Sequence, residues 1–158
     1  MGLGLRRIRH VKLPVTDLAR SVAWYRSLLE LDLVAEFAED GELRGVQLVD
    51  PDGAFGIALR ERAHSASRPD LTGFDPFALE AESLAALHAL AARCDGLGVA
   101  HGGVQDRGEW GANLDVTDPD GTVLRFLAGN VLEPGTFHGF DLHSDGTIAL
   151  NPGPRLEI

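Results

Sequence analysis

The feature that most constrains this fold is a pattern that occurs twice along the chain. In the first half, a run with the alternation of a strand precedes a helical stripe and three short strand-like runs, at residues 8–15, 18–30, 33–37, 43–50 and 55–61. The second half has the same order, at residues 76–81, 84–96, 97–101, 111–118 and 122–127. Leu18 and Leu84, which open the two helices, are 66 positions apart, and the two Asp-Pro-Asp-Gly turns are 68 apart. One register aligns both halves, so two βαβββ units are predicted.

Two such units predict an α+β fold. Each helix can cover one face of its own sheet, so we expect two curved mixed sheets to pair their free faces around a cavity, the natural place for a ligand. The paired domain is predicted at residues 1–128, with units at about 7–61 and 75–128 and a polar linker at about 62–74. Residues 129–158 are rich in glycine and proline and predict an irregular tail, with one short strand near 147–150.

Strand parity predicts which side chains face the cavity, because residues two apart in a strand share a face. One parity is apolar and should lie under the helices: Val11, Leu13, Val15, Phe77, Leu79, Ala81, Leu124 and Phe126. The other parity is polar and gives the expected cavity residues His10, Lys12, Glu80 and Arg125, with Gln47 and Arg60 added from the first unit.

Net charge limits the partners. The 24 acidic and 14 basic residues give a net charge of −10, with no basic face for nucleic acid or an anionic membrane, so neither partner is expected. The single cysteine, Cys94, lies in a predicted helix and is expected to be a small buried side chain rather than a nucleophile. No targeting leader or membrane-spanning run is recognised, so a cytoplasmic location is expected.

The run HVKLPVTDLARSVAWY from His10 to Tyr25, with DPDGTVLRF from Asp118 to Phe126, resembles the vicinal oxygen chelate superfamily. That superfamily includes glyoxalase I, extradiol dioxygenases, fosfomycin-resistance enzymes and bleomycin-resistance proteins. The resemblance covers residues 8–127 and implies the paired-unit fold and a homodimer. It also implies a choice between two kinds of protein, because some members use a divalent metal and others only bind a ligand.

The metal pattern of the family is largely missing here. His10 matches the first ligand position, but the second falls near Ala58, the third near Asp75 or Pro76, and the fourth on Arg125, a permanent cation that repels a metal. Glu61 is predicted to face the opposite side of its strand. His138 and His143 in the tail are alternative ligands if the tail folds back over the cavity. We therefore expect no metal, with His10 as its ligand if one is bound.

Lys12 and Arg125 favour an anionic or oxygen-rich small molecule, although Arg125 is alternatively expected to pair with Glu80 in place of the lost metal. Trp110, in a glycine-rich loop at residues 101–111, is expected either to pack on a flat ligand or to lie on the surface of a hairpin loop.

Two functions follow from these expectations. The first is metal-independent binding of a small molecule for sequestration or transport, and it needs no cofactor. The second is an enzyme, a lyase, isomerase or dioxygenase, with either a rearranged divalent metal site (Zn, Fe, Mn or Ni) around His10 or a general base, His10 or Glu80. The sequence does not decide between them.

Overall fold

The computed structural model describes residues 2–157, and its first half is a four-stranded mixed sheet with one helix. The sheet order is β1-β4-β3-β2, with β1 parallel to β4 and the other neighbours antiparallel. The elements are β1 (Val11–Val15), α1 (Leu18–Leu29), β2 (Asp32–Glu39), β3 (Glu42–Val49) and β4 (Gly56–Glu61).

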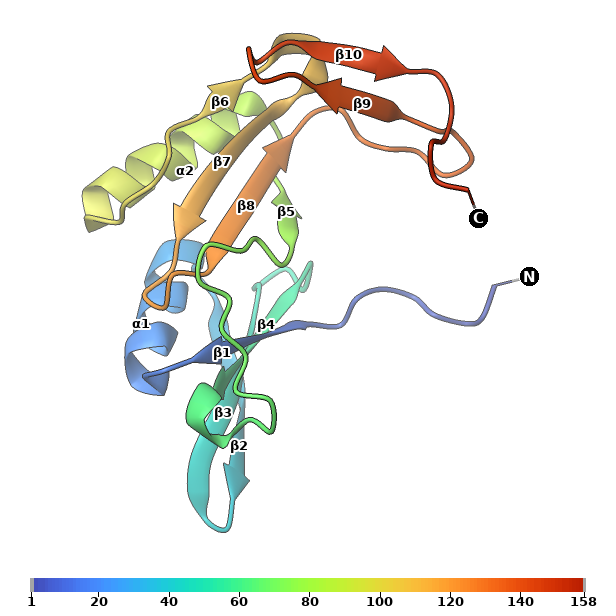
Figure 1. Ribbon diagram of the computed structural model, residues 1–158. Helices are drawn as coiled ribbons and strands as arrows, with labels where there is room; N and C mark the ends of the chain where they lie inside the picture. Colours follow the sequence, from blue (N-terminus) through green and yellow to red (C-terminus); the bar gives the residue numbers. More distant parts are fainter. Residues whose placement is uncertain (1, 158) are drawn as a thin grey trace.

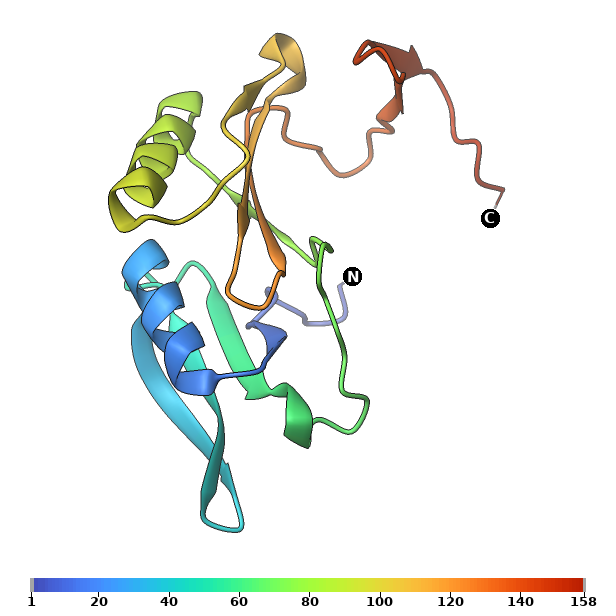
Figure 2. The same ribbon diagram turned by 60° about the vertical axis from the view of Figure 1, so that its left-hand side comes forward.

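The second half repeats this arrangement, with sheet order β5-β8-β7-β6 and β5 parallel to β8. After a short 3-10 turn, η1 (Arg62–His64), its elements are β5 (Ala78–Glu80), α2 (Leu84–Leu97), β6 (Gln105–Asp106), η2 (Gly108–Trp110), β7 (Ala112–Thr117) and β8 (Val123–Ala128). The predicted α+β fold of two βαβββ units is confirmed. Figures 1 and 2 show both helices on one side of the molecule, with the uncovered faces of the sheets turned the same way and not closed on each other.

Local sequence signals explain where the helices begin and end. The side chain of Asp17 accepts a hydrogen bond from the Arg20 amide at the start of α1, and Ser83 does the same for α2. Gly98, with φ of 67°, ends α2 in the left-handed conformation that glycine favours. The predicted strand at 97–101 is therefore wrong: the helix runs through Gly96 to Leu97, and His101 makes only an isolated bridge to Val116. The strand at this place in the second sheet is β6, at Gln105–Asp106.

The hydrophobic core lies between the helices and the sheets, as strand parity predicts. Leu13, Val15, Leu124 and Phe126 are all buried on the helix side, and Tyr25 from α1 packs among them. Within residues 2–157 no helix is both long and apolar enough to cross a membrane.

The C-terminal segment forms a two-stranded hairpin, β9 (Gly139–Leu142) paired with β10 (Ile148–Asn151), so the predicted short strand is confirmed and gains a partner. The hairpin projects beside the second unit, away from both helices (Figures 1 and 2).

A buried hydrogen bond joins the two units. The Tyr25 hydroxyl on α1 donates to Asp118 Oδ2 at 2.7 Å, and Asp118 Oδ1 accepts the backbone amides of Asp120 at 2.8 Å and Thr122 at 2.9 Å. Burial is the largest cause that raises the pKa of Asp118 above its ordinary value. Burial together with the neighbouring Asp118 carboxylate raises the pKa of Tyr25.

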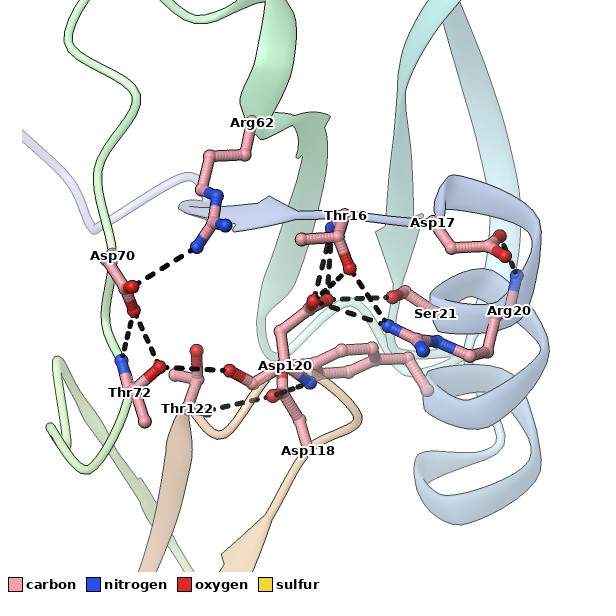
Figure 3. Close-up of polar contacts among 11 residues, drawn as sticks. Thr16, Asp17, Arg20, Ser21, Arg62, Asp70, Thr72, Asp118, Asp120 and Thr122 are labelled. Carbon is pink, nitrogen blue, oxygen red and sulfur yellow. Dashed lines mark hydrogen bonds and ion pairs between the residues drawn. The ribbon is translucent and has the colours of Figure 1, made fainter.

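Asp120, two residues after Asp118 in the same turn, reaches the beginning of α1 (Figure 3). The Asp120 carboxylate accepts hydrogen bonds from the backbone and hydroxyl of Thr16 and forms an ion pair with Arg20 at 3.3 Å. The second Asp-Pro-Asp-Gly turn therefore fixes the second sheet against the helix of the first unit. We call the contacts of Thr16, Arg20, Tyr25, Asp118 and Asp120 the junction.

Candidate functional site

The uncovered face of the first sheet carries a hollow of about 390 Å³, which contains four of the predicted site residues. Register explains the grouping: Ala58 of β4 lies between Lys12 of β1 and Gln47 of β3, so these three share one row across the sheet. We call this the first hollow; its principal residues are His10, Lys12, Phe37, Gln47, Ala58 and Arg60.

Arg60 is the best-anchored cation of the first hollow. Its Nη2 donates to Glu39 Oε1 at 2.8 Å and to the His64 carbonyl at 3.0 Å, and its guanidinium lies 4.8 Å from the centre of the Phe37 ring. Its Nη1 is buried and, among the described residues, has no hydrogen-bond partner; His10 Nδ1 is in the same condition. Two polar atoms of one hollow therefore lack partners, and a ligand oxygen would satisfy the Arg60 donor.

Glu80 and Trp110 lie elsewhere, in a second hollow of about 400 Å³ on the uncovered face of the second sheet. This second hollow is bounded by β5, the loop that carries Trp110, and the C-terminal segment. Within the chain, the predicted cavity shared by both units is therefore two separate hollows. The reason is that the sheets turn their free faces the same way instead of toward each other (Figure 2).

Arg125 lines neither hollow, and it does not pair with Glu80. Its guanidinium forms a two-bond contact with Asp115 at 2.9 and 2.8 Å and an ion pair with Asp75 at 2.7 Å. The hydrogen bonds to Arg125 lower the pKa of Asp115, and those to Asp115 raise the pKa of Arg125. The positive charge of Arg125 is thus balanced by two carboxylates. Strand parity did not predict the pair with Asp115, because Asp115 lies opposite Arg125 on the neighbouring strand β7 and parity does not give the pairing between strands.

The donor set does not fit a metal ion within the chain. His10 is next to Lys12 and Arg60 in the first hollow, Ala58 offers no donor, and Asp75 is already paired with Arg125. Glu61 lines a different groove along α1 and pairs with Arg44 at 3.0 Å. No three His, Cys, Asp or Glu residues within 2–157 gather in a way that would hold a metal.

A family model matches residues 7–126, which is most of the chain, including both sheets and both helices. The chain belongs to the glyoxalase/bleomycin resistance protein/dioxygenase superfamily. This match confirms the resemblance noted in the sequence and ends before the C-terminal segment. No curated protein sequence matches the chain.

Solved structures of this superfamily share the fold. A glyoxylase/bleomycin resistance protein/dioxygenase domain from Frankia sp. EAN1pec is 27% identical, covers 80% of this chain and 100% of its own, and has a TM-score of 0.62. TnmS3, an antibiotic binding protein from Streptomyces sp. CB03234, is 19% identical with coverages of 82% and 100% and a TM-score of 0.67. The fosfomycin resistance protein FosX from Listeria monocytogenes is 18% identical, with coverages of 80% and 96% and a TM-score of 0.63.

Two parts of the hollows could not be found from the sequence. Phe37 enters the first hollow because β2 pairs with β3, with register shifts on either side that strand alternation does not reveal. The C-terminal segment reaches the second hollow through Val131, Leu132 and Phe140. The tail histidines do not line the first hollow; His138 instead stacks against Phe140 with ring centres 6.5 Å apart.

Proposed function

We propose that this protein binds a small, anionic, oxygen-rich ligand in the first hollow without a metal, for sequestration or transport. The observation that carries the proposal is the unpartnered Arg60 Nη1, buried in the same hollow as the Lys12 side chain. A guanidinium and an ammonium on one face suit a carboxylate or a phosphonate, which accepts hydrogen bonds from both. His10, with its free Nδ1, supplies a further hydrogen-bonding group.

The relatives support small-molecule binding as a class. TnmS3 is an antibiotic binding protein, and FosX has been crystallised with Mn(II) and 1S,2S-dihydroxypropylphosphonic acid. The chain differs in its donor set: at the family's fourth ligand position it has Arg125, already paired with Asp115.

We also propose a homodimer, in which a second copy covers the uncovered sheet faces. Both faces turn the same way, and Phe37 on the first is an apolar side chain that is 51% exposed. A two-fold partner would bring two such concave faces together and enclose the hollows. Sedimentation velocity of the purified protein measures this directly; a monomer at every concentration would contradict it.

The ligand proposal is tested by calorimetric titration with phenylphosphonate in the presence of EDTA. We expect binding that weakens at least tenfold, about 1.4 kcal/mol, in Arg60→Ala and in Lys12→Ala. Arg44→Ala is the matched control, because Arg44 lies in the same sheet but pairs with Glu61 in the groove along α1. Absence of binding, or binding that requires an added divalent metal, would overturn the proposal.

A second candidate is a metal-free enzyme with His10 as general base, which the free Nδ1 in the first hollow favours. Glu80 is a base for that site only across a dimer, because within the chain it lines the second hollow. His10→Ala should abolish turnover of an enzyme but only alter affinity in a binding protein.

A further inference from the structure

The second hollow has an outer wall that lies beyond the part of the chain matched by the superfamily. Its inner wall is the sheet of the second unit with the Trp110 loop, and its outer wall comes from the C-terminal segment between residues 129 and 140, after the family match ends at 126. The principal residues are Glu80, Arg107, Trp110, Asn113, Leu132 and Phe140. The pocket therefore depends on how the C-terminal segment is held against the sheet.

Close backbone contacts hold that segment in place. Gly111, with φ of 85°, lies so near the end of β8 that a Cβ there would be 2.8 Å from the Ala128 carbonyl oxygen. A Cβ at Gly129 would in turn lie 3.5 Å from the Gly111 Cα, so the Trp110 loop and the start of the C-terminal segment are in direct contact. Asn130 adds a hydrogen bond at 3.4 Å to the Trp110 carbonyl.

Aromatic rings from both walls meet in this pocket. The Trp110 and Phe140 rings are 5.6 Å apart at 89°, the edge-to-face geometry that aromatic pairs prefer. Phe140 is nevertheless 42% exposed and Leu127 is 41% exposed, so apolar surface remains uncovered inside the pocket. A flat aromatic ring could contact both walls there and remove that surface from water.

The charged groups of the two hollows are arranged differently. The first hollow has two cations, Lys12 and Arg60, with carboxylates from Glu36 and from Glu39, which pairs with Arg60. The second hollow has one cation, Arg107, and one carboxylate, Glu80. Asn113 adds an uncharged amide that can donate or accept a hydrogen bond. This balance favours a ligand without net charge, and a pocket of about 400 Å³ is within the range of small-molecule sites.

We propose that the C-terminal segment completes a second binding site, distinct from the anion site, for an uncharged aromatic compound packed against Trp110 and Phe140. The site does not depend on the proposed function of the first hollow, because it uses different residues and a ligand of different charge.

The test is a fluorescence titration with N-phenyl-1-naphthylamine, an uncharged aromatic dye that brightens in apolar surroundings. We expect saturable binding by the full chain and about tenfold weaker binding by Phe140→Ala and by Trp110→Ala. Excess phenylphosphonate should leave the dye titration unchanged.

Two matched controls are available. Phe74→Ala removes an exposed aromatic ring that lines neither hollow, and Leu142→Ala removes an apolar side chain of the same hairpin that does not line the pocket. Both should bind the dye like the original protein, with circular dichroism confirming that every variant is folded. Unchanged binding in Phe140→Ala, or weakened binding in Phe74→Ala, would overturn the second site without affecting the test of the first.

Discussion

The two Asp-Pro-Asp-Gly turns have the same local structure but different surroundings. In each, the first aspartate accepts hydrogen bonds from backbone amides two and four residues later: Asp50 from Asp52 and Ala54, and Asp118 from Asp120 and Thr122. Of these two aspartates, only Asp118 also accepts a hydrogen bond from a hydroxyl of the other unit. The reason is that α1 has Tyr25 at the position where α2, in the register of the repeat, has Ala91.

Near the first turn, the corresponding space is a hollow instead of a hydrogen-bonded contact. This hollow has a volume of about 280 Å³. It is lined by Asp50 and Phe55 on one side and by Leu90 and Arg93 of α2 on the other. Arg93 donates to the Ser27 and Leu28 carbonyls at the end of α1, but within residues 2–157 the turn itself makes no hydrogen bond to the second unit. The bond to Tyr25, with the contacts of Asp120 to Thr16 and Arg20, therefore makes the second turn a structural connection between the units.

The largest difference between the two turns is expected in the unfolding free energy lost when the first aspartate of each turn is replaced by alanine. Asp118→Ala leaves the buried Thr122 amide, the part-buried Asp120 amide and the buried Tyr25 hydroxyl without an acceptor and should cost about 4 kcal/mol of unfolding free energy. Asp50→Ala removes only exposed hydrogen bonds of its own turn and should cost about 1 kcal/mol. Urea titration of both variants measures the difference, and equal costs would show that the turns are equivalent.

A smaller, pH-dependent effect is expected for Tyr25→Phe. Burial raises the pKa of Asp118 in the folded protein above its value in the unfolded chain. The folded protein therefore loses stability as the pH rises from the unfolded to the folded pKa and the carboxyl group ionises. The Tyr25 hydroxyl opposes this shift, so its removal should cost about 2 kcal/mol when Asp118 is ionised and less when it is protonated.

Urea titrations of Tyr25→Phe and the original protein at about pH 4 and about pH 7 measure this difference. A stability difference that is the same at both pH values would contradict a role for the ionised Asp118 carboxylate.

The smallest effect is expected at the exposed edge of the junction. Arg20 is 48% exposed and pairs with Asp120 at 3.3 Å, so Arg20→Gln should cost only about 0.5 kcal/mol. That cost should disappear in about 1 M salt, which screens exposed ion pairs. A larger, salt-independent loss would mean that Arg20 supports the junction by packing rather than by charge.

The sequence predicted those features that depend on local pattern. The repeat and the division of side chains such as Leu13 and Lys12 between sheet faces follow from short-range periodicity. Strand parity also placed His10 and Lys12 on one face, and Gln47 and Arg60, expected in addition from the first unit, line the same hollow.

Features that depend on how the units meet could not be predicted in this way. Strand parity says which face a residue occupies but not where the two faces point, so one shared cavity was expected where the chain has two hollows. Arg125 pairs with Asp115 instead of Glu80, because Asp115 on the neighbouring strand lies within hydrogen-bond distance of the guanidinium. The junction did have a signal in the sequence: the register of the repeat sets Tyr25 against Ala91, so the first helix has a hydroxyl-bearing ring where the second has a methyl group.

The junction also bears on the order in which the chain can fold. Tyr25 and Asp118 are 93 positions apart, and Thr16 and Asp120 are 104 apart, so these bonds close some of the longest loops in the molecule. During synthesis, the first unit is complete in sequence well before Asp118 is made. Until then the Tyr25 hydroxyl lacks this hydrogen-bond acceptor. The first unit therefore reaches its full stability only when the second is nearly finished, which couples the two halves into one cooperative folding event.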